Sequence, residues 1–455
     1  MAYYILKSFK LKSEPFSIFE VLNQKEHCFF LDSSLNGNHY LGRYSFLGIE
    51  PFLVLKAESQ GPFKKLRELL DKYKIRVPKQ NIPFLGGAVG YLAYDLGLRL
   101  EEKIKIRNKP HLGIPDYFFG FYNSGIILDH LRRRLYIFSV GFPERGYHLA
   151  KALAETNFKK IYKLLSYLNE DIRRYSNLRP SGFSAQLNSN FTKEEYLLAI
   201  KKAKDYIKAG DIYQVNLSQT FNTKSYLSGF DIYRRLRKIS PSYFSAYLDT
   251  GDFQILSSSP ESFLRLNGNV VTTRPMKGTR PRSENRLKDI KLKNELLKSV
   301  KDKAELTMIV DLERNDLGRV CNYDSVTVTN LRELEEYSTV FQTTATVTAR
   351  LHKDKDRLDL LRACFPGGSI TGCPKIRAME IIDELEPTRR AVYTGSLGYL
   401  SFSGEMDLNI LIRTILRKDN RLYFGVGGGI VADSKPEDEY QETLVKAKAM
   451  MEAIS

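Results

Sequence analysis

Cysteine and histidine are scarce in this sequence, and neither type is arranged as a metal-binding motif. The 455 residues include four cysteines and six histidines, with no pair spaced as C-x-x-C. The cysteines are scattered along the chain at Cys28, Cys321, Cys364 and Cys373. In a chain of this length they predict reduced, mostly buried thiols, which is typical of a cytoplasmic protein.

Long apolar runs are also missing. No stretch approaches the roughly 18 apolar residues that a spanning helix requires, so we expect no membrane association. Residues 1–16 alternate apolar and basic side chains without a continuous apolar core, which is unlike a secretory signal. Neither G-x-S-x-G nor G-x-C-x-G occurs, so no hydrolase or glutaminase nucleophile is evident.

Acidic residues are the minority charge: 53 Asp and Glu face 70 Lys and Arg, for a formal net charge of +17. Such a balance suits nucleic acid or a small anionic substrate. The densest basic segments, 131–135 and 288–303, are interleaved with apolar or acidic residues, as on a solvated surface. We therefore expect no nucleic-acid partner and favour a small anionic substrate. A non-catalytic basic binding protein stays open as an alternative of a different class.

The length exceeds the usual size of one hydrophobic core, which predicts two lobes or one large composite domain. We assign residues 1–175 to an N-terminal lobe. The polar segment 176–190 contains Pro and Gly without periodicity and is the predicted linker. Residues 191–455 form the predicted second domain.

The apolar periodicity predicts helices and hairpins in alternation. Thr192 and Glu195 make a capping box for a helix that ends at Gly210, and Pro436 suits the first turn of a last helix. Further helices are expected at 62–75 and about 146–172, a strand at 42–57, and a hairpin between 117–129 and 133–140. Because short turns join many strands, we predict an α+β fold with largely antiparallel sheets packed together and helices outside.

Three charged residues share one face of the last predicted helix. Glu439, Glu442 and Lys446 follow one another at spacings of three and four. Two carboxylates there are suited to Mg²⁺, which takes a few carboxylates plus water and substrate oxygens. A solvated Glu/Lys face is the alternative.

Lys277 lies in TTRPMKGTRPR, between a predicted strand and a loop. The neighbouring Arg274, Arg280 and Arg282 are expected to depress its pKa, because like charges disfavour the ammonium form. A lysine depressed in this way can act as a nucleophile. Two glycine-rich stretches, 365–375 and 425–433, predict loops whose N–H groups approach an anion, or plain turns.

Taken together, these segments resemble the chorismate-utilising enzymes: anthranilate synthase component I, aminodeoxychorismate synthase component I, isochorismate synthase and salicylate synthase. The resemblance covers 190–455 almost continuously, including SSSPESF, RPMKGTRPR, ELTMIVDLERNDLGRVC, FPGGSITGCPK and GGGIVADSKPEDEYQET. It is looser in the first lobe. It implies the anthranilate synthase component I-like fold for the whole chain and makes 191–455 the chorismate-binding catalytic domain.

The resemblance also implies roles for particular residues. Glu305 and Glu442 would be Mg²⁺ ligands, with Glu439 close to the metal, and Glu261 would be the general acid and base. Substrate contacts are implied for Arg413, whose fork suits a carboxylate, and for Gly427, Gly428, Gly429, Lys446, Gln214, Thr371 and Tyr393.

Three positions favour the aminodeoxychorismate synthases within this family. Isochorismate and salicylate synthases usually carry a lysine base at the position of Gln214, and an amide cannot take that proton. Anthranilate synthases usually carry alanine where Lys277 stands, and a histidine in the segment that here holds Gln342. We therefore expect an amine to replace the ring hydroxyl through a lysine adduct, with anthranilate synthase component I as the alternative.

Two partners follow from this expectation. Because no glutaminase motif is present, ammonia would come from a separate glutamine amidotransferase subunit. In the first lobe, FLDS and RYSFLG resemble the tryptophan-pocket segments of anthranilate synthases. Asp32 and Ser33 would then receive the amino group of L-tryptophan, or they only cap a turn.

Overall fold

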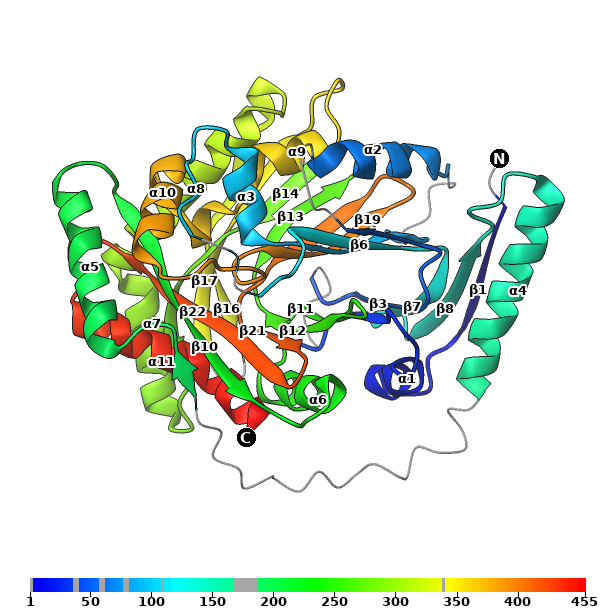
Figure 1. Ribbon diagram of the computed structural model, residues 1–455, viewed down its shortest axis with the longest axis horizontal. Helices are drawn as coiled ribbons and strands as arrows, with labels where there is room; N and C mark the ends of the chain where they lie inside the picture. Colours follow the sequence, from blue (N-terminus) through cyan, green and yellow to red (C-terminus); the bar gives the residue numbers. More distant parts are fainter. Residues whose placement is uncertain are drawn as a thin grey trace.

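Two large antiparallel sheets and the helices around them make up the architecture (Figure 1). The computed structural model describes residues 3–35, 41–56, 62–76, 82–108, 110, 112–166, 187–337 and 340–455. The helices are α1 (Pro15–Leu22), α2 (Pro62–Lys72), α3 (Tyr94–Leu100), α4 (Tyr147–Ser166), α5 (Lys193–Lys208), α6 (Gly229–Ile239), α7 (Arg286–Lys298), α8 (Val300–Gly318), α9 (Arg357–Cys364), α10 (Lys375–Leu385) and α11 (Pro436–Ile454), with the 3-10 helices η2 (Tyr323–Ser325) and η3 (Gly368–Ile370).

The first sheet has twelve strands in the described part of the chain. In spatial order they are β1 (Tyr4–Lys10), β8 (Arg134–Val140), β7 (Ser124–Asp129), β3 (Tyr44–Gly48), β2 (Phe29–Asp32), β11 (Phe244–Asp249), β12 (Phe253–Ser259), β21 (Thr414–Lys418), β22 (Arg421–Ile430), β10 (Gln214–Lys224) and β18 (Gly372–Cys373), while β9 (Asn188–Ser189) pairs with β10.

The second sheet has ten strands within the same described ranges. Its order is β15 (Met276–Pro281), β17 (Val340–Arg350), β14 (Val270–Arg274), β13 (Ser262–Asn267), β20 (Met406–Ile410), β19 (Ser396–Ser401), β5 (Gly87–Leu92), β6 (Tyr117–Tyr122) and β4 (Leu53–Lys56), with β16 (Thr327–Glu336) paired to β17. Mixed helices and antiparallel sheets confirm the predicted α+β fold class.

Both sheets contain strands from both halves of the chain. In the first sheet β2 pairs with β11, and in the second β5 pairs with β19. The predicted N-terminal lobe and the predicted second domain therefore share hydrogen-bonded strands. The division at 176–190 stays a prediction, since most of that linker lies outside the described residues.

Alternation along the strands of the first sheet builds two apolar layers. Phe29 and Ile127 face the core shared with the second sheet, whereas their neighbours Phe30 and Ile126 face α1, α4, α6 and α11. This is the two-residue period of a sheet covered on both faces. Figure 1 shows α4 along β1 and β8, at the side of the molecule away from α5.

Several local predictions are confirmed. Thr192 and Glu195 form the predicted capping box on α5, and Gly210 takes a positive φ of 83° just after it. Pro436 opens α11, and the helix predicted at 62–75 is α2. The hairpin turn after Asp129 is also as predicted.

Two expected strands are each divided between the sheets. The segment 117–129 forms β6 in the second sheet and β7 in the first, separated by Asn123, and 42–57 likewise gives β3 and β4. Asn123 Nδ2 donates to the Phe142 carbonyl, 2.5 Å away, which holds the bend. The sequence pattern does not reveal such a crossing, because β6 and β7 are both buried.

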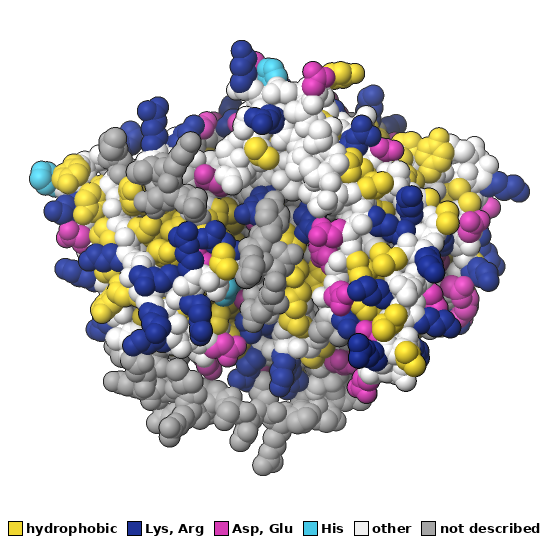
Figure 2. Space-filling view, turned by 180° about the vertical axis from the view of Figure 1, so that it is seen from behind, with side chains coloured by type: hydrophobic (Ala, Val, Ile, Leu, Met, Phe, Trp, Pro, Cys, Tyr) yellow, Lys and Arg dark blue, Asp and Glu magenta, His cyan; other side chains and the backbone are white. Residues whose placement is uncertain are grey.

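The described surface carries its positive charge in dispersed form. On the face shown in Figure 2, lysine and arginine side chains are spread among acidic, apolar and uncharged ones. No helix of the described chain is long and apolar enough to cross a membrane. The absence of a nucleic-acid partner stays a prediction.

Candidate active site

The site forms where one end of the second sheet meets the glycine-rich strand β22 of the first. Lys277 lies on β15 and pairs with Thr343 of β17. A Cβ placed on Gly429 would lie 3.1 Å from Lys277 Nζ and 3.2 Å from the Gln214 amide. The fold thus places Lys277 of the second sheet against the glycine backbone of the first.

The pKa of Lys277 is lowered, chiefly because burial disfavours the ammonium form. Glu305 opposes this shift, and Lys446 adds to it. The direction matches the sequence prediction, but the predicted cause was wrong. The flanking arginines are paired with acids of their own: Arg274 with Glu335, Arg280 with Asp302 and Arg282 with Asp289. Lys277 also lies within a strand, not beside a loop.

Glu261 lies in the short connection between β12 and β13 and is almost completely buried. Burial raises its pKa to about 7. Two neighbours oppose this rise by favouring the ionised form. Ser369 Oγ donates to Glu261 Oε1 at 2.6 Å, and the charge of Lys277 also lowers the pKa of Glu261. A carboxyl group with this pKa can both give and take a proton near neutral pH.

Three glutamates face the same region from two helices. Glu305 comes from α8, and Glu439 and Glu442 come from α11. A Cβ on Gly428 would lie 3.0 Å from Glu439 Oε2 and 3.7 Å from Glu442 Oε1. Burial raises the pKa of Glu305 and Glu439, and the charge of Glu442 raises both further.

The donor set fits Mg²⁺, since this ion takes a few carboxylates and completes its shell with water and substrate oxygens. Among the described residues, no three His, Cys, Asp or Glu side chains are gathered closely enough to form a metal centre by themselves. Instead, Glu442 pairs with Lys446 at 2.6 Å, and Ser434 Oγ donates to Glu439 at 2.6 Å. Burial opposes the charge of Glu442, but Lys446 lowers its pKa, so this carboxylate is kept ionised.

The glycine cluster lies in a strand, which corrects the predicted loop. Gly427, Gly428 and Gly429 face Ser218, Leu217 and Asn216 of β10 across an antiparallel ladder. The neighbouring strand β21 pairs with β22 only at 421–423. On that side of the described chain the three glycines have no strand partner, and Lys446 Nζ donates to the Gly427 carbonyl at 2.9 Å.

Arg413 stands between β20 and β21 with a positive φ of 50°, a strained conformation for a residue with a side chain. Burial lowers the pKa of its guanidinium. Within the described chain, no ion pair or side-chain hydrogen bond engages Arg413. It is a cation that its surroundings leave available for an anionic partner.

The remaining predicted substrate residues differ in availability. Both amide atoms of Gln214 are buried and have no hydrogen-bond partner among the described residues. Thr371 Oγ1 is already engaged, donating to the Gly367 carbonyl at 2.8 Å. The ring of Tyr393 packs against Gly425, where a Cβ would lie only 2.3 Å from Tyr393 Cγ.

Asp32 and Ser33 lie apart from this group. They line a separate cavity of about 70 Å³, whose lining includes Tyr44 and Tyr243 but no residue of the Lys277 region. Arg237 pairs with Asp32 Oδ2 at 2.5 Å, whereas Asp32 Oδ1 has no hydrogen-bond partner in the described chain. Ser33 Oγ donates to the Tyr44 carbonyl at 2.8 Å.

Glu313 and Ser369 are two further polar residues of this region that were not predicted from the sequence. Glu313 is buried on α8, where Thr273 Oγ1 donates to it at 2.9 Å, and burial raises its pKa to about 8. The charge of Glu261 adds to that rise. The spacing could have indicated its burial. Glu313 follows Ile309 by four residues and Val310 by three, which places it on the apolar face of α8.

Comparison with known proteins agrees with this arrangement. Residues 26–452 match the chorismate binding enzyme family. Anthranilate synthase component 1 of Acetivibrio thermocellus is 38% identical over 97% of this chain and 92% of its own. Aminodeoxychorismate synthase component 1 of Bacillus subtilis is 36% identical over 96% of this chain and 93% of its own. A crystal structure of anthranilate synthase component I from Streptococcus pneumoniae superposes with a TM-score of 0.78, 34% identity and coverage of 90% and 92%.

The two antiparallel sheets and their surrounding helices are thus the fold of the chorismate binding enzymes. The chain belongs to the chorismate binding enzyme family, in the group of anthranilate synthase and aminodeoxychorismate synthase. This confirms the resemblance and the fold.

The proton on Glu313 gives the folded state a pH dependence. Its folded pKa, about 8, lies above the ordinary 4.5. Its contribution to stability is full below about pH 4.5 and is lost as the pH rises through about 8. We expect Glu313→Gln to flatten the fall in unfolding free energy over this range by up to about 1.4 kcal/mol per pH unit. Thermal unfolding at pH 5.5, 7 and 9 measures this.

The control is Glu155→Gln on α4, whose side chain is 44% exposed. It should follow the wild-type pH profile. A Glu313→Gln variant that also follows the wild-type profile would show that Glu313 is ionised in the folded protein.

Proposed function

We propose that this chain is the large subunit of a 4-amino-4-deoxychorismate synthase, which exchanges the ring hydroxyl of chorismate for an amine. The observation that carries the proposal is Lys277, a lysine of lowered pKa placed beside Glu261, Gln214 and the glycines of β22. Desolvation raises the fraction of neutral amine, which is the nucleophilic form. One named relative, from Bacillus subtilis, is an aminodeoxychorismate synthase component 1.

In the first half-reaction, the Nζ of Lys277 forms a C–N bond to the ring as the C–O bond breaks. Glu261 gives its proton to the departing hydroxyl, which leaves as water. In the second half-reaction, ammonia forms a new C–N bond and the bond to Lys277 breaks. The proton released by ammonia returns to Glu261. A pKa near 7 suits a group that performs both transfers.

The anionic end of chorismate is assigned to the opposite side of the site. Mg²⁺, held by Glu305 and Glu442 with Glu439 nearby, would supply positive charge to a substrate carboxylate. Arg413 offers a second carboxylate a planar fork that no described residue occupies. Lys446 and the backbone of Gly427–Gly429 border the same space. These contacts orient the ring so that its hydroxyl carbon meets Lys277.

Gln214 and Gln342 support this assignment over the sibling reactions. Gln214 Oε1 and Nε2 and Gln342 Oε1 are buried and unpaired in the described chain. An amide in either place cannot remove a proton, so neither activation of water nor aromatisation of the ring has a base there. Anthranilate synthase component I remains the second candidate because several named relatives carry that name.

The amine itself is assigned to a second protein. The named relatives are each a component 1, which places them in enzymes of more than one component. The sequence contains no glutaminase elbow. We therefore propose that a glutamine amidotransferase subunit supplies ammonia, in a cytoplasmic pathway toward 4-aminobenzoate and folate.

Identification of the product by mass tests the reaction. The purified chain, given chorismate, Mg²⁺ and ammonium, should form aminodeoxychorismate. Lys277→Ala should lower this turnover by at least about 10³-fold, the scale of removing a covalent nucleophile. The matched control is Lys291→Ala, at an exposed position of α7. Anthranilate as the wild-type product would reverse the assignment, and an active Lys277→Ala variant would remove the covalent step.

Titration of Mg²⁺ by calorimetry tests the metal assignment without relying on turnover. Glu442→Gln should weaken Mg²⁺ binding by about 10-fold or more, because it removes a charged oxygen ligand. Glu437→Gln, an exposed position on the same helix, serves as the control. Equal Mg²⁺ affinity in wild type and Glu442→Gln would strike Glu442 from the metal site.

The cavity at Asp32 is proposed to bind L-tryptophan. The free Asp32 Oδ1 is suited to an ammonium group, and Tyr44 and Tyr243 provide aromatic walls. Calorimetry should detect L-tryptophan binding to the wild type and about 10-fold weaker binding to Asp32→Asn, which loses a charge-assisted contact. Absence of binding to the wild type would leave Asp32 and Ser33 as structural residues.

A further inference from the structure

One edge of strand β10 changes its hydrogen-bond partner several times along its length. Gln214 and Val215 pair with the two-residue strand β18. The amide of Asn216 then donates to the Thr371 carbonyl at 2.7 Å. Beyond Ser218, the side chain of Asn190 and strand β9 take over. Between these partners, the Asn216 carbonyl and the Ser218 amide face no strand in the described chain.

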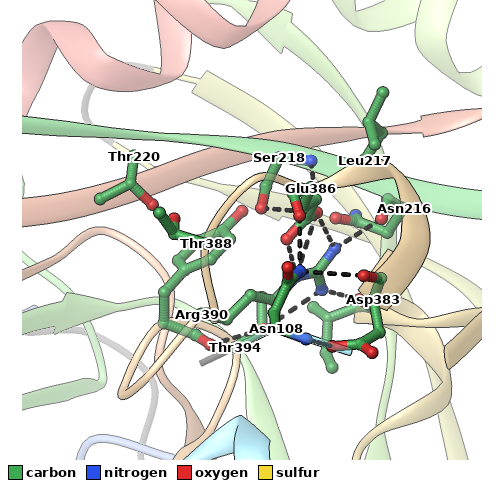
Figure 3. A network of polar contacts seen from close by, with 12 residues as sticks. Asn108, Asn216, Leu217, Ser218, Thr220, Asp383, Glu386, Thr388, Arg390 and Thr394 are labelled. Atoms are coloured by element: carbon green, nitrogen blue, oxygen red, sulfur yellow. Dashed lines mark hydrogen bonds and ion pairs between the residues drawn. The ribbon is translucent and has the colours of Figure 1, made fainter. Parts of the chain in front are cut away.

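The side chains of Arg390 and Glu386 fill this gap (Figure 3). Arg390 Nη2 donates to the Asn216 carbonyl at 2.6 Å, and Glu386 Oε1 accepts from the Ser218 amide at 2.8 Å and the Ser218 hydroxyl at 2.9 Å. The two side chains also bind each other in a fork, with Nη2 2.6 Å from Oε1 and Nε 2.9 Å from Oε2. A buried ion pair thus completes the ladder where a strand is missing.

The same arginine reaches two other segments of the site. Its Nη1 donates to the Ile370 carbonyl at 2.9 Å, next to Thr371, and to Thr394 Oγ1 at 3.3 Å, next to Tyr393. The guanidinium lies over the ring of Tyr94, with its carbon 4.7 Å from the centroid. A planar group with five donors can serve all these directions at once, whereas the single ammonium of a lysine cannot.

The ion pair has little freedom to move. Both side chains are at least 96% buried, since Arg390 and Glu386 each retain 4% exposure. Glu386 follows the end of α10, where Asn108 Nδ2 donates to the carbonyls of Glu386 and Asp383 at 2.6 and 2.9 Å. Residues of the N-terminal half therefore hold the base of the pair in place (Figure 3).

We propose that Arg390 and Glu386 are positioning residues for chorismate turnover. They fix β10 relative to the loop at Thr371 and the turn at Tyr393, and so keep Gln214 and the glycines of β22 aligned with Lys277. The inference rests on the proposed site but not on its product. The glutamates proposed to hold Mg²⁺ come from α8 and α11, and no hydrogen bond of the pair in the described chain reaches either helix.

The test compares Arg390→Lys with Arg357→Lys. Arg357 is a partly buried arginine that likewise donates to backbone carbonyls, those of Ser401 and Glu405, and none of its hydrogen bonds in the described chain reaches the site. Both variants should lower the melting temperature. Only Arg390→Lys should lower kcat, by about 10²-fold, because small misplacement of reacting groups has that effect. Its Mg²⁺ affinity by calorimetry should equal that of the wild type.

Disappearance of chorismate is the activity readout, so the identity of the product does not enter. A wild type that forms anthranilate would overturn the proposed function and leave this comparison intact. Arg390→Lys with kcat within threefold of wild type overturns the positioning role, as does an equal loss in Arg357→Lys. If Arg390→Lys does not fold, Ser218→Ala decides: a lowered kcat with unchanged Mg²⁺ affinity supports the role, and an unchanged kcat overturns it.

Discussion

The burial of an amine at the junction of two sheets is the constraint on which the rest of this site depends. Desolvation lowers the pKa of Lys277, whereas Glu305, Glu261 and Glu442 act to raise it. The outcome is a lysine of lowered pKa that still has acids around it. Neither sheet provides this environment separately, since Lys277 comes from one and its glycine surface from the other. The environment of Lys277 therefore depends on how the two sheets pack against each other.

The glycines of β22 leave the space that this packing requires. At Gly428 and Gly429, any side chain would enter the space of Glu439 and Lys277. The strand keeps its ladder to β10 while presenting bare backbone to the site. A run of glycines weakens a strand, because the unfolded chain gains freedom and no side chain packs. Its partner strand β10 is in turn held on the opposite edge by the buried ion pair of Arg390 and Glu386.

The elements that short-range rules govern could be predicted from the sequence. The capping box at Thr192 and the proline at the start of α11 depend only on neighbouring residues, and both were confirmed. The helical face of Glu442 and Lys446 follows from spacing, and the two are in contact. The division of 117–129 between two sheets was missed, because a buried apolar run has the same pattern in either sheet.

The causes of the pKa shifts were harder to predict from the sequence than the residues that show them. Proximity in sequence suggested that arginines depress Lys277, but each is paired with its own acid, and burial acts instead. Burial depends on distant segments that spacing does not reveal. The same applies to Glu313 and to Arg390, whose hydrogen-bond partner Asn216 stands 174 positions away in the chain. Such groups become visible only when the sheets are assembled.

The shared strand pairs have a consequence for how this chain can be divided. A fragment that starts after the predicted linker would keep every residue of the Lys277 site and yet leave β11 and β19 as open edges. Exposed edges of this kind invite pairing with other chains. The C-terminal segment alone would therefore lack strand partners that both sheets need, and we expect it not to fold as an independent unit.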